Sequence, residues 1–203
     1  MAGCCDDGCS LDAGAQRQRR TLVAVLVINA AMFAVVLAAA LYAGSTALLA
    51  DSLDNLGDAL TYVLSLWAVA RGTTAKARVA LVKGVLILAG ALVVLGQVGY
   101  RLVVPTTPLF EVMGAFSILA LMANGLCLAL LSRHRHEDVN MSSVWECSRN
   151  DIVANLSVFA AAAGVWLTGQ GWPDLVVGLA LGVFLLRSAL RVIGQARREL
   201  TTA

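Results

Sequence analysis

The chain has 203 residues, of which 59% are hydrophobic and 14% are charged, and its formal net charge is +2. Soluble domains are about 45–50% apolar and about 25% charged, so this composition, with a mean hydropathy of +0.80, argues against a soluble domain. It predicts an all-α membrane protein, because apolar runs of about 20 residues are typical of transmembrane helices. We expect the lipid bilayer, and no nucleic acid, among its partners.

Residues 1–20 are polar and rich in cysteine, and we expect a cytoplasmic head rather than a cleaved signal peptide. The apolar run that follows is too long for the core of a signal sequence. Cys4, Cys5 and Cys9 lie beside Asp6 and Asp7. Short cysteine tracts indicate metal binding, so the head is either a metal-capture segment or a disordered tail. Five cysteines without regular spacing argue against a disulfide framework.

Six apolar segments follow in chain order, each close to the length that crosses a bilayer. They cover residues 21–43, 46–70, 79–101, 109–131, 144–168 and 172–193. We therefore expect six transmembrane helices in one transport domain over residues 21–195, followed by a short cytoplasmic tail over residues 196–203.

Basic residues gather in alternate connections between these segments. Cytoplasmic loops carry the excess of Lys and Arg, so both termini are predicted to be cytoplasmic. Lys83 and Arg149 lie inside spans near cytoplasmic ends, and we expect them to extend toward the interface. The basic residues of the predicted cytoplasmic segments are Arg17, Arg19, Arg20, Arg71, Lys76, Arg78, Arg133, Arg135, Arg197 and Arg198.

The second span carries three aspartates, Asp51, Asp54 and Asp58, together with Asn55. Residues three and four apart share a helix face, so all of them form one stripe. Each carboxylate at bilayer depth costs about 2.5–3.5 kcal/mol on insertion scales. The stripe is therefore expected to face the interior of the bundle and bind something positive. Asp51 lies nearest the membrane surface, and we expect a helix-end or water-exposed role for it, or a place on an exit or proton path.

The fifth span repeats this spacing with Cys147 and Asp151, and Asn155 follows one turn later. Together with Asp54 and Asp58, they offer three carboxylates and one thiolate, a set suited to a tetrahedral divalent ion. A thiolate favours softer metals, and ligands that must deprotonate link metal binding to proton concentration. Two alternatives remain: Cys147 is a small buried hydrophobe, or Asp151 pairs with Arg149 or with a cation of a neighbouring helix.

Two further groups have a structural and a metal-binding interpretation. His134 and His136 lie two apart in a predicted cytoplasmic loop, which is either a loop metal site or a solvated charged loop. Cys127 and Asn124 in the fourth span are predicted to serve packing and interhelical hydrogen bonding.

The stretches "STALLADSLDNLGDAL", "NMSSVWECSRND" and "GWPDLVVGLALGVFLLRSALRV" resemble the cation diffusion facilitators, a family of metal-ion/proton antiporters. The resemblance implies a transport site of two residues from the second helix and two from the fifth. These positions fall on Asp54, Asp58, Cys147 and Asp151. The family commonly has His where this chain has Cys147. The resemblance therefore implies that the transported ion is cadmium, lead or another soft ion as well as zinc.

Most members of that family also have a cytoplasmic ferredoxin-like domain after the membrane helices, and this sequence has no room for one. We expect a short form, in the bacterial inner membrane, that forms a homodimer through its membrane helices. The expected function is efflux of a divalent heavy-metal cation by proton antiport. No nucleophile–base pair or nucleotide motif indicates an enzyme, and no permanently bound cofactor is expected. The alternative is a membrane-anchored metal sensor or chaperone acting through the N-terminal cysteines.

Overall fold

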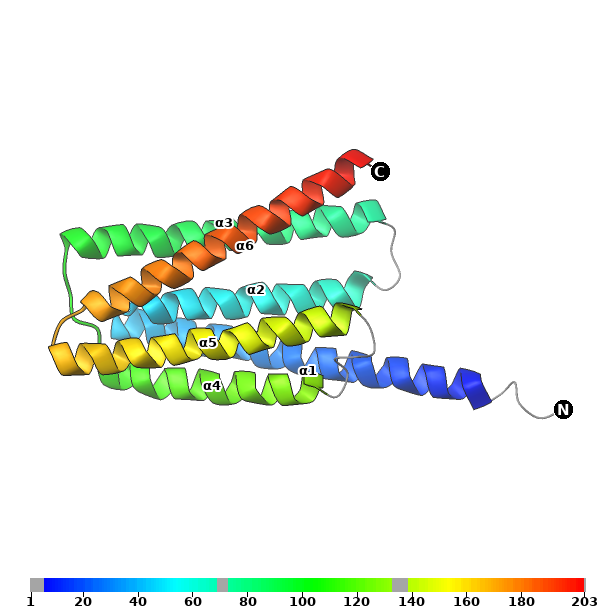
Figure 1. Ribbon diagram of the computed structural model, residues 1–203, viewed down its shortest axis with the longest axis horizontal. Coiled ribbons are helices and arrows are strands. Elements are labelled where there is room, and N and C mark those ends of the chain that lie inside the picture. The colour runs from blue at the N-terminus through cyan, green and yellow to red at the C-terminus, as the bar shows by residue number, and fades with distance from the viewer. Residues whose placement is uncertain (1–5, 69–72, 133–138, 203) are drawn as a thin grey trace.

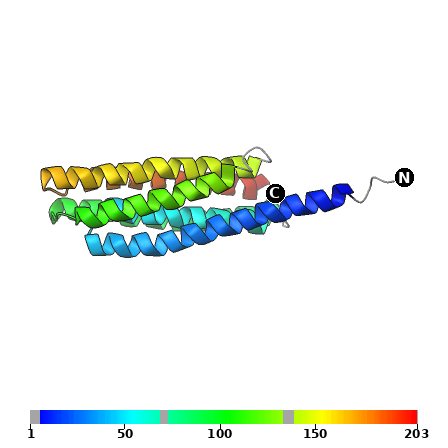
Figure 2. The ribbon, with the colours of Figure 1, turned by 90° about the horizontal axis from the view of Figure 1, so that it is seen from below.

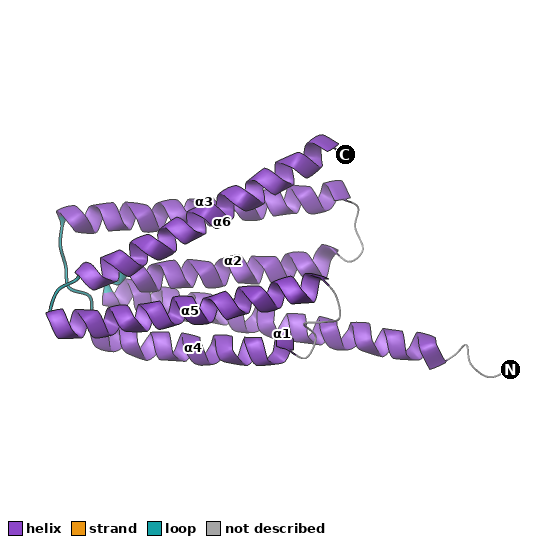
Figure 3. Cartoon of the chain, in the orientation of Figure 1, coloured by secondary structure: helices purple, strands orange, loops and turns teal. Residues whose placement is uncertain are grey.

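The computed structural model describes residues 6–68, 73–132 and 139–202, and all of its regular elements are helices (Figures 1 and 3). The bounds of the helices are α1 Asp6–Ala43, α2 Thr46–Ala68, α3 Thr73–Val103, α4 Phe110–Ser132, α5 Val139–Thr168 and α6 Trp172–Thr202. Within the described residues, five helices are long and apolar enough to cross a membrane, and the remaining helix, α2, carries the three aspartates. The prediction of an all-α membrane protein is confirmed.

The helices run up and down in one elongated bundle (Figures 1 and 2). The hairpin partners α1 and α2 pack together, as do α4 and α5, whereas α3 packs mainly against α6. Helix α2 contacts α1, α3, α5 and α6, which makes it the most central element. Both ends of the chain lie at the same end of the bundle. We call the opposite end, formed by residues 44–45, 104–109 and 169–171, the outer end, because the charge pattern predicts that it faces away from the cytoplasm.

Most helices extend beyond the spans that hydropathy predicts. α1 begins at Asp6 rather than near residue 21, and its first turns project past the rest of the bundle (Figure 2). α3 and α5 begin several residues before the predicted spans, and α6 continues to Thr202. Hydropathy marks the part of a helix that lies in lipid, whereas the hydrogen-bonded backbone continues through polar residues with good helix propensity.

Glycines end two of the helices at the outer end. Gly44 and Gly169 have φ values of 66° and 64°, a left-handed conformation that glycine adopts without steric cost. The N–H of Gly169 donates to the carbonyl of Val165 at 2.8 Å. The 104–109 connection is tied to the first hairpin, because the N–H of Leu109 donates to the carbonyl of Ala43 at 3.1 Å.

The pair α3–α6 is held close by small residues, as in other membrane bundles. A Cβ atom added to Gly84 of α3 would lie 2.7 Å from Cγ1 of Ile193. On the facing helix, a Cβ atom at Gly182 would lie 3.0 Å from Cγ1 of Val94. Side chains larger than hydrogen at these positions would push α3 and α6 apart.

Candidate metal site

The outer part of α2, which carries the aspartates, is fixed at its first turn. Ser45 is the N-cap residue, since its Oγ accepts a hydrogen bond from the N–H of Leu48 at 3.1 Å. From this start, Asp51, Asp54 and Asp58 follow on one face of the helix. Asp51 is 2% exposed, and Asp54 and Asp58 are partly buried. The predicted inward orientation of the acidic stripe agrees with this burial.

Asp58 of α2 and Asp151 of α5 meet across the helix contact. Their carboxyl groups are within hydrogen-bonding reach of each other, and Asp151 is 8% exposed. Asp54 is close enough to both Asp51 and Asp58 for their charges to interact. The fold thus brings together one acid from each predicted ligand pair, from positions far apart in the sequence.

A cation and a thiol also lie beside Asp58. Lys83 of α3 donates from Nζ to Oγ1 of Thr61, one turn along α2 from Asp58, and its charge acts on that aspartate. Lys83 thus has a hydrogen-bond partner on α2 within the bundle. α3 packs against α2, so the hydroxyl of Thr61 and the carboxylate of Asp58 lie within reach of the ammonium group. The charge of Asp58 also acts on the thiol of Cys127 of α4.

Cys127 also contacts α1. It is fully buried, and its Sγ accepts a hydrogen bond of 3.8 Å from Nδ2 of Asn29. The same Nδ2 donates to the carbonyl of Val25 at 3.0 Å. This packing agrees with the structural role predicted for Cys127. Asn124, one turn away on the same helix, is 2% exposed.

The remaining predicted ligands are not placed by the structure. Cys147 belongs to α5, one turn before Asp151, but its side chain lies outside the described part of the molecule. The same holds for the side chain of Cys9, which falls within α1. Cys4, Cys5, His134 and His136 lie outside the described residues altogether.

Among the side chains that the structure describes, no three of His, Cys, Asp or Glu converge closely enough to hold a metal ion. The contact between Asp58 and Asp151 is the core of the candidate site, with Asp54 one turn away. Two carboxylates from different helices offer oxygen donors at this contact, and Cys147 lies one turn before Asp151 in α5. This geometry fits a cation bound between α2 and α5.

Asp174, in the first turn of α6, has no role predicted from the sequence and is 2% exposed. Its carboxylate accepts three hydrogen bonds from the start of α2: from Oγ of Ser45 at 2.6 Å, from the N–H of Thr46 at 2.8 Å and from the N–H of Ala47 at 3.0 Å. Gly178, one turn later, allows close contact, since a Cβ atom there would lie 2.9 Å from Cγ2 of Thr46. The signal available in the sequence was an acid near the start of the sixth apolar segment.

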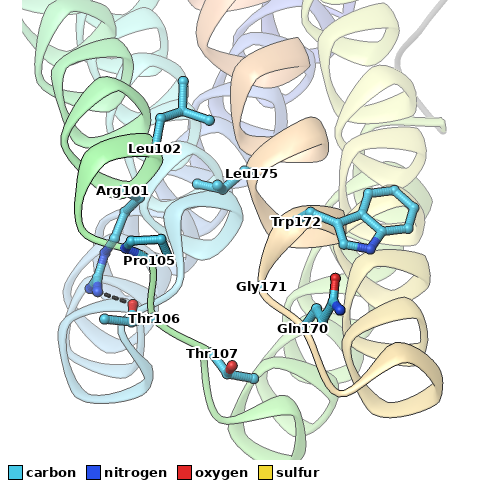
Figure 4. Close-up of a pocket in the computed structure, with 9 residues that line it drawn as sticks. All are labelled: Arg101, Leu102, Pro105, Thr106, Thr107, Gln170, Gly171, Trp172 and Leu175. Atoms are coloured by element: carbon cyan, nitrogen blue, oxygen red, sulfur yellow. Dashed lines mark hydrogen bonds between the residues drawn. The ribbon is translucent and has the colours of Figure 1, made fainter.

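A separate groove of about 420 Å³ opens at the outer end, between the 104–109 and 169–171 connections. One wall carries Arg101, which donates to Oγ1 of Thr106, and the other carries Gln170 and Trp172 (Figure 4). None of the acids of α2 or α5 lines this groove. It is therefore distinct from the candidate metal site.

The helical bundle and its buried acids define the class: an integral membrane protein whose interior holds carboxylates suited to a cation. Residues 22–201 match the family model of the cation efflux transmembrane domain. The chain belongs to this cation efflux family, and the predicted resemblance to the cation diffusion facilitators is confirmed.

One curated relative is the cation efflux system protein CzcD of Alcaligenes sp. (strain CT14). The two sequences are 26% identical over 170 residues, which covers 73% of this chain and 53% of the relative. The chain thus spans about half the length of that relative.

Proposed function

We propose that this chain exports a divalent heavy-metal cation from the cytoplasm in exchange for protons, as a transporter rather than an enzyme. The contact between Asp58 and Asp151 is the observation that carries the proposal. Two carboxylates in the membrane interior cost free energy. A cation that binds between α2 and α5 offsets this cost. Membership of the cation efflux family supports the same function.

Four residues bind the cargo in this proposal: Asp54 and Asp58 on α2, and Cys147 and Asp151 on α5. Carboxylate and thiolate ligands bind metal only when deprotonated. A metal ion entering from the cytoplasm therefore displaces protons from the site. Protons arriving from the other side displace the metal after the site opens outward. Exchange follows because metal and proton favour different populations of the same transporter.

The cargo class follows from the ligands. A set of three carboxylates and one thiolate suits zinc, cadmium or lead better than magnesium or calcium, because thiolates select softer ions. Cys147→His replaces the sulfur with a nitrogen ligand that zinc binds readily. We expect this variant to shift the tolerance of a host cell from cadmium and lead toward zinc. Identical tolerance profiles would remove Cys147 from the site.

The proposal is tested in proteoliposomes that contain a metal-sensitive dye or a pH-sensitive dye. Addition of zinc or cadmium is expected to drive metal into the vesicles and protons in the opposite direction. Asp58→Asn and Asp151→Asn each remove a charged ligand, and we expect metal flux to fall more than about tenfold. Glu111→Gln is the matched control, because Glu111 is an exposed acid in the first turn of α4. Wild-type flux in both Asp variants would contradict the site.

The alternative function is tested by the metal tolerance of host cells. If removal of residues 1–10 abolishes metal tolerance while Asp54→Asn does not, the protein is a metal sensor or chaperone that acts through Cys4, Cys5 and Cys9.

We also propose that two copies associate through their membrane helices in the bacterial inner membrane. Light scattering of the detergent-solubilised protein measures the mass of the assembly, and a monomer would contradict the dimer.

A further inference from the structure

Asn155 of α5 is fully buried, and neither polar atom of its side chain has a hydrogen-bond partner among the residues that the structure describes. Buried amides are nearly always hydrogen-bonded, because water is lost and must be replaced. An amide at bilayer depth with both Nδ2 and Oδ1 unpaired within the described part of the chain is therefore an unusual feature. It indicates that the partner of Asn155 is not one of the described side chains.

The position of Asn155 points to the candidate metal site. It lies four residues after Asp151, on the same face of α5. Since α2 and α5 are antiparallel, the step from Asp151 to Asn155 and the step from Asp58 to Asp54 both lead toward the outer end. Asp151 contacts Asp58, so Asn155 lies at the level of Asp54. A small void lined by Asp51, Asp54 and Ala154 shows that this turn of α5 lies beside the acids, although Asn155 itself does not line the void.

We propose that Asn155 is a further ligand of the transported divalent cation, with its Oδ1 oxygen completing the coordination shell on the outer side of the acids. This inference rests on the function proposed above. An amide carbonyl is an oxygen ligand for divalent cations, and it binds without releasing a proton. Nδ2 then donates to a carboxylate or to a water molecule held by the ion. Asn155 strengthens metal binding without changing the number of protons exchanged.

The test replaces Asn155 with an apolar side chain of similar shape. We expect Asn155→Leu to raise the apparent KM for zinc or cadmium flux about tenfold, which corresponds to about 1.4 kcal/mol. The factor is the same at every pH, because the amide does not titrate. The unfolding temperature of the metal-free protein stays unchanged or rises, because an unpaired buried amide has been removed. A purely structural role for Asn155 predicts the reverse: a lower unfolding temperature.

Two further variants make the test specific. Asn155→Asp keeps an oxygen ligand in nearly the same place, and we expect it to retain tight metal binding while making KM depend more steeply on pH than in the wild type, because one more ligand must lose a proton. Ser157→Ala is the control on the same helix, because the Ser157 hydroxyl donates to the carbonyls of Val153 and Ala154 within α5. An unchanged KM in Asn155→Leu, or a raised KM with a lower unfolding temperature, overturns the inference.

Failure of the inference about Asn155 can be distinguished from failure of the proposed function. If Asp58→Asn abolishes flux while Asn155→Leu has the wild-type KM, the metal site stands and the inference about Asn155 fails. If wild-type protein carries no flux, or Asp58→Asn leaves it unchanged, the proposed function fails, and the inference, which rests on it, fails with it. Titration of metal to the detergent-solubilised variants gives affinities that do not depend on transport.

Discussion

The carboxylate of Asp174 holds the first turn of α2 from another helix, and Asp174→Ala tests this arrangement. The substitution removes the acceptor for the Oγ of Ser45 and for the N–H groups of Thr46 and Ala47. Both N–H groups belong to residues that are fully buried. Water therefore cannot replace the lost acceptor without opening the contact between α2 and α6.

The magnitude follows from these two buried donors. A buried donor left without a partner costs about 1–3 kcal/mol, so two of them give about 2–6 kcal/mol. Ser45→Ala is milder. It removes the hydroxyl bonds to Asp174 and Leu48 but leaves both backbone bonds to the carboxylate, and loss of an N-cap side chain costs about 0.5–2 kcal/mol. Asp174→Asn retains one acceptor oxygen and is expected to fall between the two.

The assay is SDS-titrated unfolding in mixed micelles, which gives a free energy of unfolding for each variant. The free energy of unfolding is expected to decrease in the order wild type, Ser45→Ala, Asp174→Asn and Asp174→Ala. Thr168→Ala is the control at the same end of the bundle, because its exposed hydroxyl bonds only to chain neighbours: it donates to the carbonyl of Gly164 and accepts from the N–H of Gln170. If Asp174→Ala unfolds at the wild-type detergent concentration, or Ser45→Ala costs more than Asp174→Ala, the capping argument is refuted.

The remaining predictions concern backbone positions at the outer end and are tested with the same assay. Gly171→Ala places a Cβ atom 2.3 Å from the carbonyl oxygen of Thr106. The backbone shift that this forces is expected to lower the free energy of unfolding by about 1–3 kcal/mol. Unchanged stability would show that the 104–109 and 169–171 connections do not touch. Gly44→Ala puts a side chain at a φ of 66° and should cost about 1–2 kcal/mol. Gly96→Ala, inside α3 with no atom near the added Cβ, should instead stabilise by roughly 1 kcal/mol. Equal effects at Gly44 and Gly96 would argue against backbone strain.

The parts of the fold that depend on local chemistry are readable in the sequence. Six apolar runs predict six helices, and the alternation of basic connections predicts that both termini lie at one end of the bundle, as observed. The i, i+4 spacing identifies Asp58 and Asp151 as members of two polar helix faces, and the structure places these two side chains in contact. Spacing works here because a face of a helix is a local property.

Features that depend on how helices meet are not readable in the same way. An acid in the first turn of a helix commonly stabilises the dipole of its own helix, but the hydrogen-bond donors to Asp174 belong to the start of α2. Lys83 is expected to extend toward the nearest interface, but Thr61 lies within its reach on α2. In both cases the partner is set by tertiary packing, and no pattern within the helix itself records it.

The pairing of α3 with α6 sets an order for assembly in the membrane. The hairpins α1–α2 and α4–α5 join neighbours in the chain, and each is complete as soon as its second helix has been synthesised. α3 contacts its predecessor α2 but packs mainly against α6 through a glycine-lined surface, and α6 is synthesised three helices later. Asp174 enters with that same last helix. The first turn of α2 thus acquires its buried carboxylate only when α6 inserts, and a chain that stops after α5 would contain the acids of the candidate site without the contacts that fix α2.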